Sequence, residues 1–475
     1  MRPLVTAMNS VTESARQLAV VAQADVLVAG GGVSGLAAAI CAGRAGAQTM
    51  LLERTSLLGG TATAGLMANV TNHCFEKSGR QVVKGFTEEF LNRLAERNGG
   101  LRDWRHAEVP QVPFDPEVFQ LVAMEMVREV KVRVWLETWA VGVLAEEGKV
   151  TGIVVETRGG RKALRGKVTV DCTGDADLAC LAGAEMRVGH GGHSLEFRMG
   201  NVGLERAYQF VRDNARNFIE KSDVPTLFAD FCRNWEERGL FHLPHGGGRE
   251  MPLLQEAIKR GEFKAEDGRA YGMDSLGMYA VRGDSTVIVN ANFFRFDVFD
   301  PDEYTAVQFE AREKCFYVAD FLGRHFPGFE NAFIVATAPT LGLRRTRCIT
   351  GAYVLNDADL RRGAQFDDVV GLASEIRDEA RLERAVEIPY RCLLPQRVEG
   401  LLVASGKTIS TDPCALIRGQ AHCMTIGQAA GVAAALSARP GVVPSQLDVK
   451  ALQRALLVQN VFLGDADRLS ALGLS

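Results

Sequence analysis

ADVLVAGGGVSGLAAA, residues 24–39, decides the fold of this 475-residue chain. Asp25–Ala29 (DVLVA) is a short run, apolar from Val26 onwards, of the kind that forms a buried parallel strand. Leu36–Ala45 is rich in alanine and leucine and favours a helix directly afterwards. The glycines lie at the joint between the two, so the stretch predicts a strand, a tight turn and a helix.

The glycines of this stretch have the Gly-x-Gly-x-x-Gly spacing of a dinucleotide-binding turn. Gly30 makes the turn, Gly32 lets the backbone approach a pyrophosphate, and Gly35 allows the helix to pack closely on the strand. The next stretch, AQTMLLE, predicts a second strand that ends at Glu53. An acid at this place accepts hydrogen bonds from the hydroxyls of an adenosine ribose. Together these features predict a bound dinucleotide.

A second glycine pair indicates which dinucleotide it is. RTSLLGGTATAG, residues 54–65, brings Gly59 and Gly60 and the hydroxyls of Thr61 and Thr63 directly after the second strand. NAD needs no further loop at this point. FAD extends beyond its pyrophosphate and needs backbone close to its ribityl chain, so the pair favours FAD.

Bulk composition excludes several classes of partner. Hydrophobic residues make up 47% of the chain, charged residues 24%, and the net charge is -4, which gives no field to attract nucleic acid or acidic lipid. No apolar run approaches the ~20 residues that span a bilayer. The ten cysteines contain no Cys-x-x-Cys pair, so we expect free, mostly buried thiols, no metal or iron–sulfur site, and a cytoplasmic protein.

Three later stretches carry a family resemblance: KVTVDCTGDADLACLAGAE (167–185), TLGLRRTRCITGAYVL (340–355) and residues 388–436. With the opening stretch, they resemble the FAD-dependent oxidoreductase family that is distantly related to the flavin subunits of fumarate reductase and heterodisulfide reductase. The resemblance implies an α/β protein of the glutathione-reductase type. We expect a Rossmann-like FAD-binding domain with a parallel sheet and a discontinuous α+β substrate, or cap, domain.

The resemblance also implies how the chain is divided. The FAD-binding domain is expected to comprise residues 1–75, 116–190 and 336–475, and the cap residues 76–115 and 191–335. There is no second strand–glycine–helix unit for a nicotinamide dinucleotide, which argues against a pyridine-nucleotide disulfide reductase.

FAD contacts are implied, residue by residue, by the family pattern. A predicted strand at Leu401–Ala404 leads into one part of the site, and a helix start near Gly427 would stabilise negative charge on reduced flavin. The implied FAD residues are Gly30, Gly32, Ser34, Gly35, Glu53, Arg54, Gly59, Gly60, Thr61, Ala140, Thr173, Gly174, Asp175, Gly406, Lys407, Gly427 and Gln428.

Arginines suggest the charge of the substrate. Arg344, Arg345 and Arg347 cluster before a predicted strand, and planar guanidinium groups suit carboxylates and phosphates. Arg344 is our candidate anchor for an anionic substrate. The alternative is that these arginines bind the FAD pyrophosphate or pair with nearby acids. Lys407 is the candidate for stabilising charge on the flavin.

Two histidines are candidates for proton transfer. His73, in ANVTNHCFEKSG, follows the second glycine pair and is the first candidate, as an acid or base or, with Cys74, as a covalent link to the flavin. A structural, hydrogen-bonded histidine is the alternative. His193, in GHGGHSLEFRMG, is a lesser candidate.

These observations predict an FAD-dependent oxidoreductase that transfers a hydride between a small organic substrate and flavin N5. The arginines favour an anionic substrate. One alternative is a fumarate-reductase-like reductase of an activated double bond, and another is a flavoprotein that uses FAD structurally. The electron acceptor (oxygen, a quinone or a redox protein), the direction of the reaction and formation of a homo-oligomer stay open.

Overall fold

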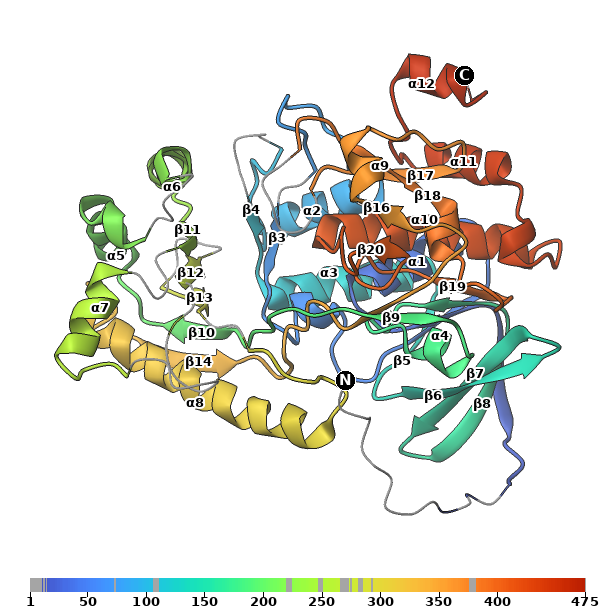
Figure 1. The fold of residues 1–475 in the computed structure, drawn as a ribbon, viewed down its shortest axis with the longest axis horizontal. Helices are drawn as coiled ribbons and strands as arrows, with labels where there is room; N and C mark the ends of the chain where they lie inside the picture. The colour runs from blue at the N-terminus through green and yellow to red at the C-terminus, as the bar shows by residue number, and fades with distance from the viewer. Residues whose placement is uncertain are drawn as a thin grey trace.

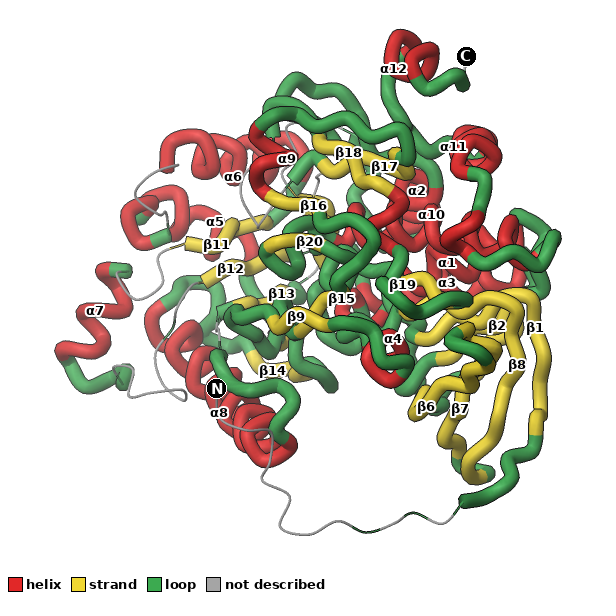
Figure 2. The backbone as a smooth tube through the Cα atoms, turned by 45° about the vertical axis from the view of Figure 1, so that its right-hand side comes forward, coloured by secondary structure: helices red, strands yellow, loops and turns green. Residues whose placement is uncertain are grey.

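The predicted strand at residues 25–29 lies inside a seven-stranded sheet (Figure 1). The computed structural model describes residues 11, 13, 15–71, 74–105, 111–218, 224–246, 251–264, 273, 276–280, 285–291, 294–375 and 382–474. Within them the chain forms a large α/β part and a smaller part built on a separate sheet (Figures 1 and 2).

The large sheet combines parallel strands with an antiparallel edge. Its order is β5-β2-β1-β8-β7-β6, and β19 also pairs with β8. All pairs among β5, β2, β1, β8 and β19 are parallel, whereas β8, β7 and β6 form an antiparallel meander. The strands are β1 (Val20–Ala29), β2 (Thr49–Leu52), β5 (Arg133–Trp135), β6 (Trp139–Glu146), β7 (Lys149–Thr157), β8 (Gly160–Asp171) and β19 (Leu401–Val403).

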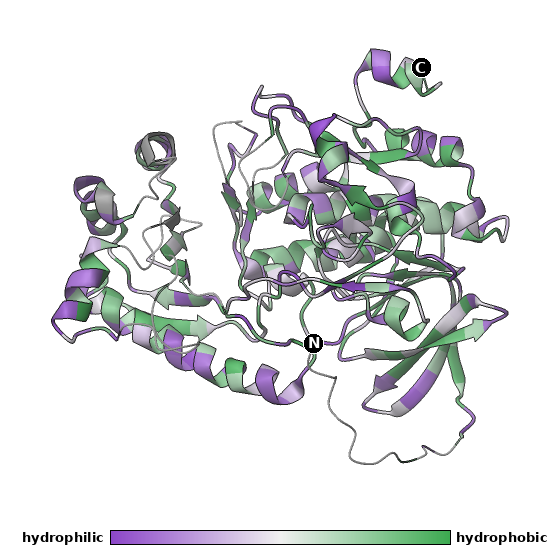
Figure 3. Ribbon diagram, viewed as in Figure 1, coloured by the Kyte–Doolittle hydropathy of each residue, from purple (hydrophilic) through white to green (hydrophobic). Residues whose placement is uncertain are grey.

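Strand β1 is buried on both faces, which explains its continuous apolar run. Val26 and Val28 pack on the face covered by helices, and Leu27 and Ala29 pack on the opposite face with side chains of the meander. The covering helices are α1 (Val33–Arg44), α3 (Pro116–Glu129) and α10 (Gln420–Ala438). In Figure 3 the large sheet and α10 are mainly hydrophobic, as this double burial requires.

Helices α1 and α10 approach each other backbone to backbone. A Cβ atom added at Gly427 would lie 2.1 Å from the carbonyl oxygen of Ser34, and one added at Gly431 would lie 2.1 Å from that of Ala38. Only glycine fits at these two positions. The small residues of α10 therefore set how closely the C-terminal helix packs on the first helix of the chain.

Four two-stranded sheets and several helices surround the large sheet. The strand pairs are β3 (Asn69–Thr71) with β4 (Gln111–Pro113), β9 (Met186–Val188) with β15 (Arg347–Ile349), β16 (Leu355–Asn356) with β20 (Thr411–Asp412), and β17 (Val369–Ala373) with β18 (Val386–Pro389). The helices are α2 (Phe86–Glu96), α4 (Asp177–Leu181), α9 (Asp357–Arg361), α11 (Val449–Val458) and α12 (Ala466–Ala471).

The cap is a five-stranded antiparallel sheet with its own core. Its order is β11-β12-β13-β10-β14, and helix α8 runs along it (Figure 1). Its strands are β10 (Phe197–Gly200), β11 (His242–Gly246), β12 (Leu276–Tyr279), β13 (Val287–Asn290) and β14 (Phe333–Thr337). Its helices are α5 (Leu204–Asp213), α6 (Val224–Arg238), α7 (Pro252–Lys259) and α8 (Pro301–His325). Among the described residues, none of the helices combines the length and apolarity needed to cross a membrane.

Three features differ from the sequence predictions. Helix α10 begins at Gln420, after Gly419, so Gly427 and Gln428 lie inside the helix and not at its start. Helix α2 packs in the core of α1 and α3, although residues 76–115 were assigned to the cap. Both differences arise from tertiary packing that local periodicity does not encode.

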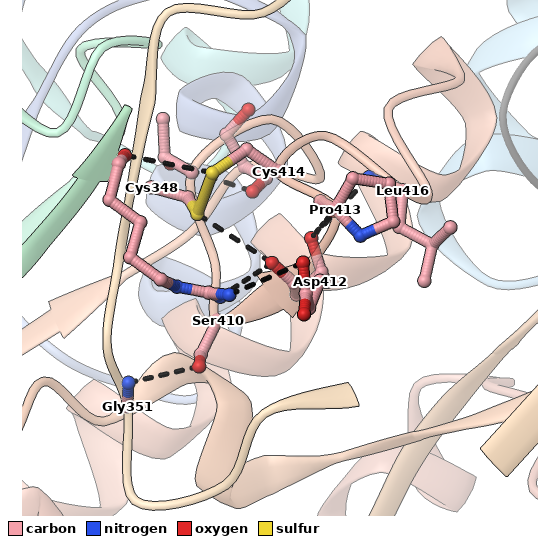
Figure 4. The surroundings of a disulfide bond; sticks show 11 residues. Cys348, Gly351, Ser410, Asp412, Pro413, Cys414 and Leu416 are labelled. Carbon is pink, nitrogen blue, oxygen red and sulfur yellow. Dashed lines mark hydrogen bonds and ion pairs between the residues drawn. A yellow bond between two sulfur atoms is a disulfide. The ribbon is translucent and has the colours of Figure 1, made fainter. Parts of the chain in front are cut away.

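The third difference is a disulfide between Cys348 and Cys414, which corrects the expectation of free thiols throughout (Figure 4). The two cysteines are 66 residues apart in the sequence, so no short motif marks them. Strand β15 brings Cys348 beside the turn at 410–416, and the amide of Gly351 donates to Ser410 Oγ across the same junction (2.9 Å). The other eight cysteines are free.

The close helix contact predicts the effect of adding one methyl group. Gly427→Ala should lower the free energy of unfolding by about 1–3 kcal/mol, because the added Cβ atom overlaps the carbonyl of Ser34. Gly323→Ala is the matched control in α8, where the nearest atom to an added Cβ is 3.5 Å away, and it should be neutral or stabilising by ~0.5 kcal/mol. Urea denaturation followed by circular dichroism measures both. Equal stabilities of the two variants would contradict the packing argument.

The disulfide predicts the number of reactive thiols. Protein purified without reductant and then denatured should titrate eight thiols with Ellman's reagent, because eight of the ten cysteines are free. Prior reduction should raise the value to ten. Ten thiols without reduction would show that Cys348 and Cys414 are not joined.

Candidate functional site

The first glycine loop connects β1 to α1 and leaves the start of the helix open. Gly30 has φ +102°, and a Cβ atom there would lie 2.2 Å from the carbonyl oxygen of Cys172. Gly32 is the N-cap of α1, and no side chain caps the helix. The first N–H groups of α1 are therefore available to an anion, and the helix dipole favours negative charge there.

The second glycine pair lies directly against the first loop. Gly59 donates its N–H to the carbonyl of Gly31 (2.8 Å), and Gly32 and Gly59 form a parallel bridge. Gly60 has φ +55°, and a Cβ atom there would lie 2.9 Å from the Cα of Gly32. The two loops thus lie backbone against backbone and form one cradle, in which a Cβ atom at Gly30, Gly59 or Gly60 would overlap a neighbour, whereas the space beside Gly32 is open.

Glu53 lies at the end of β2, within this cradle, and is buried. Its Oε2 accepts the N–H of Gly31 (2.7 Å), and its Oε1 accepts the N–H and hydroxyl of Thr55 (2.8 and 2.9 Å). A carboxylate can accept about four hydrogen bonds, two per oxygen, so after these three contacts Oε2 keeps capacity for a ribose hydroxyl. These bonds also fix the carboxylate beside the glycine loop.

The end of β8 forms the third wall. Asp171 accepts hydrogen bonds from Thr173 and from the N–H of Ala179, which ties the turn at 173–175 to the start of α4. Burial raises the pKa of Asp171 to about 6. Asp171 therefore has a structural role, and it holds Thr173 and Gly174 next to the Gly30 turn.

Lys407 and Asp175 join the third wall to the segment after β19. Lys407 Nζ lies 3.4 Å from Asp175 Oδ1, which also accepts the hydroxyl of Thr346 (2.8 Å). Burial opposes ionisation of Asp175, but Lys407, Thr346 and Arg54 outweigh it and lower the pKa of the carboxyl. The ion pair keeps a cation at this wall of the cradle.

The other predicted FAD residues have varied surroundings. Ser34 lies in the first turn of α1, Thr61 follows the second glycine pair, and Ala140 packs in the core beneath β1 and β2. Arg54 stacks over the Trp139 ring at 6.0 Å. A Cβ atom on Gly406 would lie 2.1 Å from the carbonyl of Ile417.

Gln428 has partners of its own inside the protein. Its Oε1 accepts the N–H of Phe86 (2.9 Å), and its Nε2 donates to the carbonyl of Gln459 (3.0 Å). Gly427, its neighbour, contacts Ser34 of α1. In this structure both residues join α10 to neighbouring elements.

Two glycine loops, an uncapped helix start, a terminal acid on β2 and a third wall from β8 fit a dinucleotide with two phosphates. The sequence model of the FAD dependent oxidoreductase family matches residues 25–456. The chain belongs to this family. The cofactor of this oxidoreductase is therefore FAD, and the protein is an enzyme.

Several solved structures are similar to the oxidoreductase at low identity. A geranylgeranyl bacteriochlorophyll reductase-like protein from Thermoplasma acidophilum is 12% identical, with 95% of this chain and 90% of that chain covered and a TM-score of 0.42. The p-nitrophenol 4-monooxygenase of Pseudomonas putida is 12% identical (95% and 89% covered, TM-score 0.45). An L-amino acid deaminase from Proteus vulgaris is 12% identical (93% and 95% covered, TM-score 0.40). None of the curated proteins compared with the chain matches it.

His193 and Arg344 meet between the cap and the flavin cradle. The backbone N–H of Arg344 donates to His193 Nδ1 (3.1 Å), so the neutral ring carries its proton on Nε2. Burial, followed by the charges of Arg344, Lys407 and Arg418, lowers the pKa of His193 to about 4. His193 is therefore a neutral hydrogen-bond donor at pH 7, with three cations and one acid, Asp175, acting on its ring.

Neighbouring arginines have structural partners. Arg347 donates to the carbonyl of Asp175 and to Asp177 Oδ1 (both 2.6 Å), and Arg391 pairs with Asp368 (2.9 Å). Arg345 lies along the backbone of Gly189 and Gly191. Arg344 donates to the carbonyl of Gly192 (3.4 Å) through its guanidinium and to His193 through its backbone N–H, so it lies beside that ring and is our candidate for a substrate role.

The covalent-tether hypothesis receives little support from Cys74. Cys74 is fully buried, and burial raises the pKa of its thiol to about 12, so it stays a thiol at neutral pH. His73 lies outside the described residues, so its role remains a prediction.

A buried polar cluster at the junction of cap and cradle was missed by sequence reasoning. It consists of Glu196, Tyr279, Asn290, His242 and Gln111, which are joined by hydrogen bonds around the segment 66–69. The one available signal was Glu196 itself, an acid between the apolar Leu195 and Phe197.

Three buried oxygens of this region have no hydrogen-bond partner among the described residues. They are Asn69 Oδ1, Asn290 Oδ1 and Gln420 Oε1. Asn69 belongs to the segment 66–69, and Gln420 donates to its Met67 carbonyl. Asn290 is linked to the segment indirectly, through Glu196 and Tyr279. Since buried acceptors are normally satisfied, this region has capacity for the N–H or O–H groups of a bound molecule.

The position of Glu53 predicts its contribution to FAD binding. Glu53→Gln should weaken FAD binding about tenfold, because one charged acceptor is lost and the loop contact to Gly31 is disturbed. Titration of the FAD-free protein with FAD, followed by quenching of flavin fluorescence, measures the Kd. The exposed Glu147→Gln is the control and should bind FAD normally. An unchanged Kd for Glu53→Gln would remove Glu53 from the FAD site.

Proposed function

We propose that this FAD-dependent oxidoreductase transfers a hydride between a small organic anion and the N5 atom of the flavin. The observation that carries this proposal is the positive charge around His193. Burial lowers its pKa most; Arg344, Lys407 and Arg418 lower it further, against the single opposing acid Asp175, so cations from separate segments outnumber acids around this buried ring. An anion with carboxylate or phosphate oxygens would offset this charge.

The residues around His193 have complementary roles in the proposal. Arg344 would bind the anionic group of the substrate through its guanidinium. His193 would donate its Nε2–H to a substrate oxygen, because its Nδ1 lone pair is already occupied by the N–H of Arg344. It would not act as a base through Nδ1. His73 therefore remains the candidate acid or base for proton transfer.

Lys407 would serve the cofactor side of the site. Bound FAD supplies the acceptor for the hydride, or its donor in the reverse reaction. Lys407 would stabilise negative charge there, and Asp175 would hold the ammonium group in place at 3.4 Å. The N-terminus of α10 at Gln420, rather than the residues near Gly427, is the helix end available for the same purpose.

We infer that the flavin domain is of the glutathione-reductase type and comprises residues 1–75, 116–190 and 336–475, together with α2. The separate cores of the large part and of the cap support this division. The cap would then consist chiefly of residues 191–335. This arrangement leaves the proposed substrate site at the junction, where His193 of the cap segment meets Arg344.

Anion binding tests the proposal without knowledge of the natural substrate. Formate, acetate, succinate and benzoate are titrated into the FAD-loaded protein, and the flavin absorption spectrum reports binding. Arg344→Gln should weaken the tightest of these anions about tenfold or more, because a charge-assisted contact is lost. Arg324→Gln, on the exposed face of α8, is the matched control. If no anion perturbs the wild-type flavin, or if Arg344→Gln binds as wild type does, the anionic site is wrong.

A further inference from the structure

Glu196 is a buried carboxyl group without an ion pair among the described residues. It directly precedes β10 and is 2% exposed. Its Oε2 lies 2.8 Å from Tyr279 Oη, and its Oε1 accepts the Nδ2–H of Asn290 (2.9 Å). An ionised carboxylate at such a place would be costly, because no cation among the described residues is in hydrogen-bonding contact with it.

The contacts of Tyr279 decide where the hydrogen atoms lie. Its Oη is 3.0 Å from the carbonyl oxygen of Leu66 and 3.1 Å from the backbone nitrogen of Ala68. The N–H of Ala68 also donates to the carbonyl of Leu66. The hydroxyl has a single hydrogen. If that hydrogen pointed to Glu196, the hydroxyl and carbonyl oxygens would face each other with no hydrogen between them.

A protonated Glu196 satisfies all three contacts at once. The carboxylic acid donates to Tyr279 Oη, the hydroxyl donates to the carbonyl of Leu66, and the N–H of Ala68 donates to Tyr279 Oη. Burial agrees with this assignment, since it raises the pKa of Glu196 to about 8 although the charge of Arg344 acts to lower it. Glu196 is thus a neutral acid at pH 7.

The segment held by Tyr279 joins the two parts of the molecule. Leu66 packs in the core of the cap, whereas Tyr279 and Ile288, from cap strands, pack in the core of the large part. From the other side, Gln420 at the start of α10 donates to the carbonyl of Met67 (2.7 Å). The segment follows the second glycine pair, so its position is coupled to the FAD cradle.

We propose that Glu196 is a positioning residue that, as a neutral carboxylic acid, donates a hydrogen bond to Tyr279. This bond fixes segment 66–68 and the cap against the FAD cradle. This role does not depend on the identity or charge of the substrate. Among the described residues, the charged or titratable side chains that act on Glu196 or lie beside Tyr279 are Tyr279 itself on β12, Arg344, and His242 on β11, whose ring centroid lies 6.5 Å from that of Tyr279.

Glu196→Gln and Glu196→Leu distinguish a neutral acid from an ionised one. A glutamine amide donates to Tyr279 and accepts from Asn290, as the protonated acid does, so Glu196→Gln should retain FAD with the wild-type affinity. Glu196→Leu and Tyr279→Phe should lose about tenfold in FAD affinity. If Glu196→Gln is as impaired as Glu196→Leu, the proposal is overturned.

The pH dependence of stability gives a readout that a packing role alone would not produce. The folded protein keeps a proton that the unfolded chain releases above its ordinary pKa of ~4.3, so the stability contributed by Glu196 falls as the pH rises towards about 8. The Tm of the FAD-loaded Glu196→Gln variant should therefore rise relative to wild type between pH 5 and pH 8, and the gap should be constant above pH 8.

Flavin fluorescence tests the positioning role directly in the same proteins. Between pH 6 and pH 9.5 the fluorescence of bound flavin in wild type should change with a midpoint near pH 8, and Glu196→Gln should show no such step. Glu313→Gln, exposed on α8, is the control and should follow wild type. A Tm gap that does not vary with pH, or a wild-type signal that is flat to pH 9.5, would show that Glu196 is not the neutral acid proposed.

Discussion

The backbone contact between α1 and α10 is the constraint on which the rest of this oxidoreductase depends. Gly427 and Gly431 bring the two helices so close that the carbonyls of Ser34 and Ala38 fill the space of absent side chains. The contact fixes the start of α1, and this start forms the floor of the glycine cradle. It also fixes the start of α10, where Gln420 donates to the carbonyl of Met67. Tyr279 of the cap contacts the same segment from the other side. Cofactor cradle and cap junction are thus aligned by one helix pair.

The two sides of the site are electrostatically different. Around His193, burial and then cations from several segments keep the ring neutral, and these cations favour negative charge. Around Glu196, a few residues away, burial keeps a carboxyl group neutral and the contacts are uncharged hydrogen bonds. A carboxylate at Glu196 would partly cancel the field of Arg344. Keeping this acid protonated therefore preserves the positive charge that the site presents.

Local patterns were sufficient to predict the centre of the fold. The strand at 25–29, the helix after it, the strand before Glu53 and the strand at 401–404 are all present, because a buried parallel strand and a glycine turn leave a signal within a few residues. The glycine loops and Glu53 were found for the same reason. The disulfide of Cys348 and Cys414, the start of α10 and the placement of α2 were not predicted, since each depends on segments far apart in the chain. Glu196 and Tyr279 were not predicted, because their role depends on a hydrogen-bond network between segments that are far apart in the sequence.

Strand β19 pairs with β8 at the centre of the large sheet, although it is synthesised long after β1 and α1. In a nascent chain emerging from the ribosome, the edge of β8 stays exposed until β19 has been made. The face of α1 that contacts Gly427 and Gly431 stays exposed until α10 has been made. The N-terminal half contains the dinucleotide-binding motif, but it lacks α10, the helix that packs on α1 and fixes the position of this motif. The FAD cradle is therefore complete only once the C-terminal segment has been made, and until then the open edge of β8 is a surface on which chains can associate.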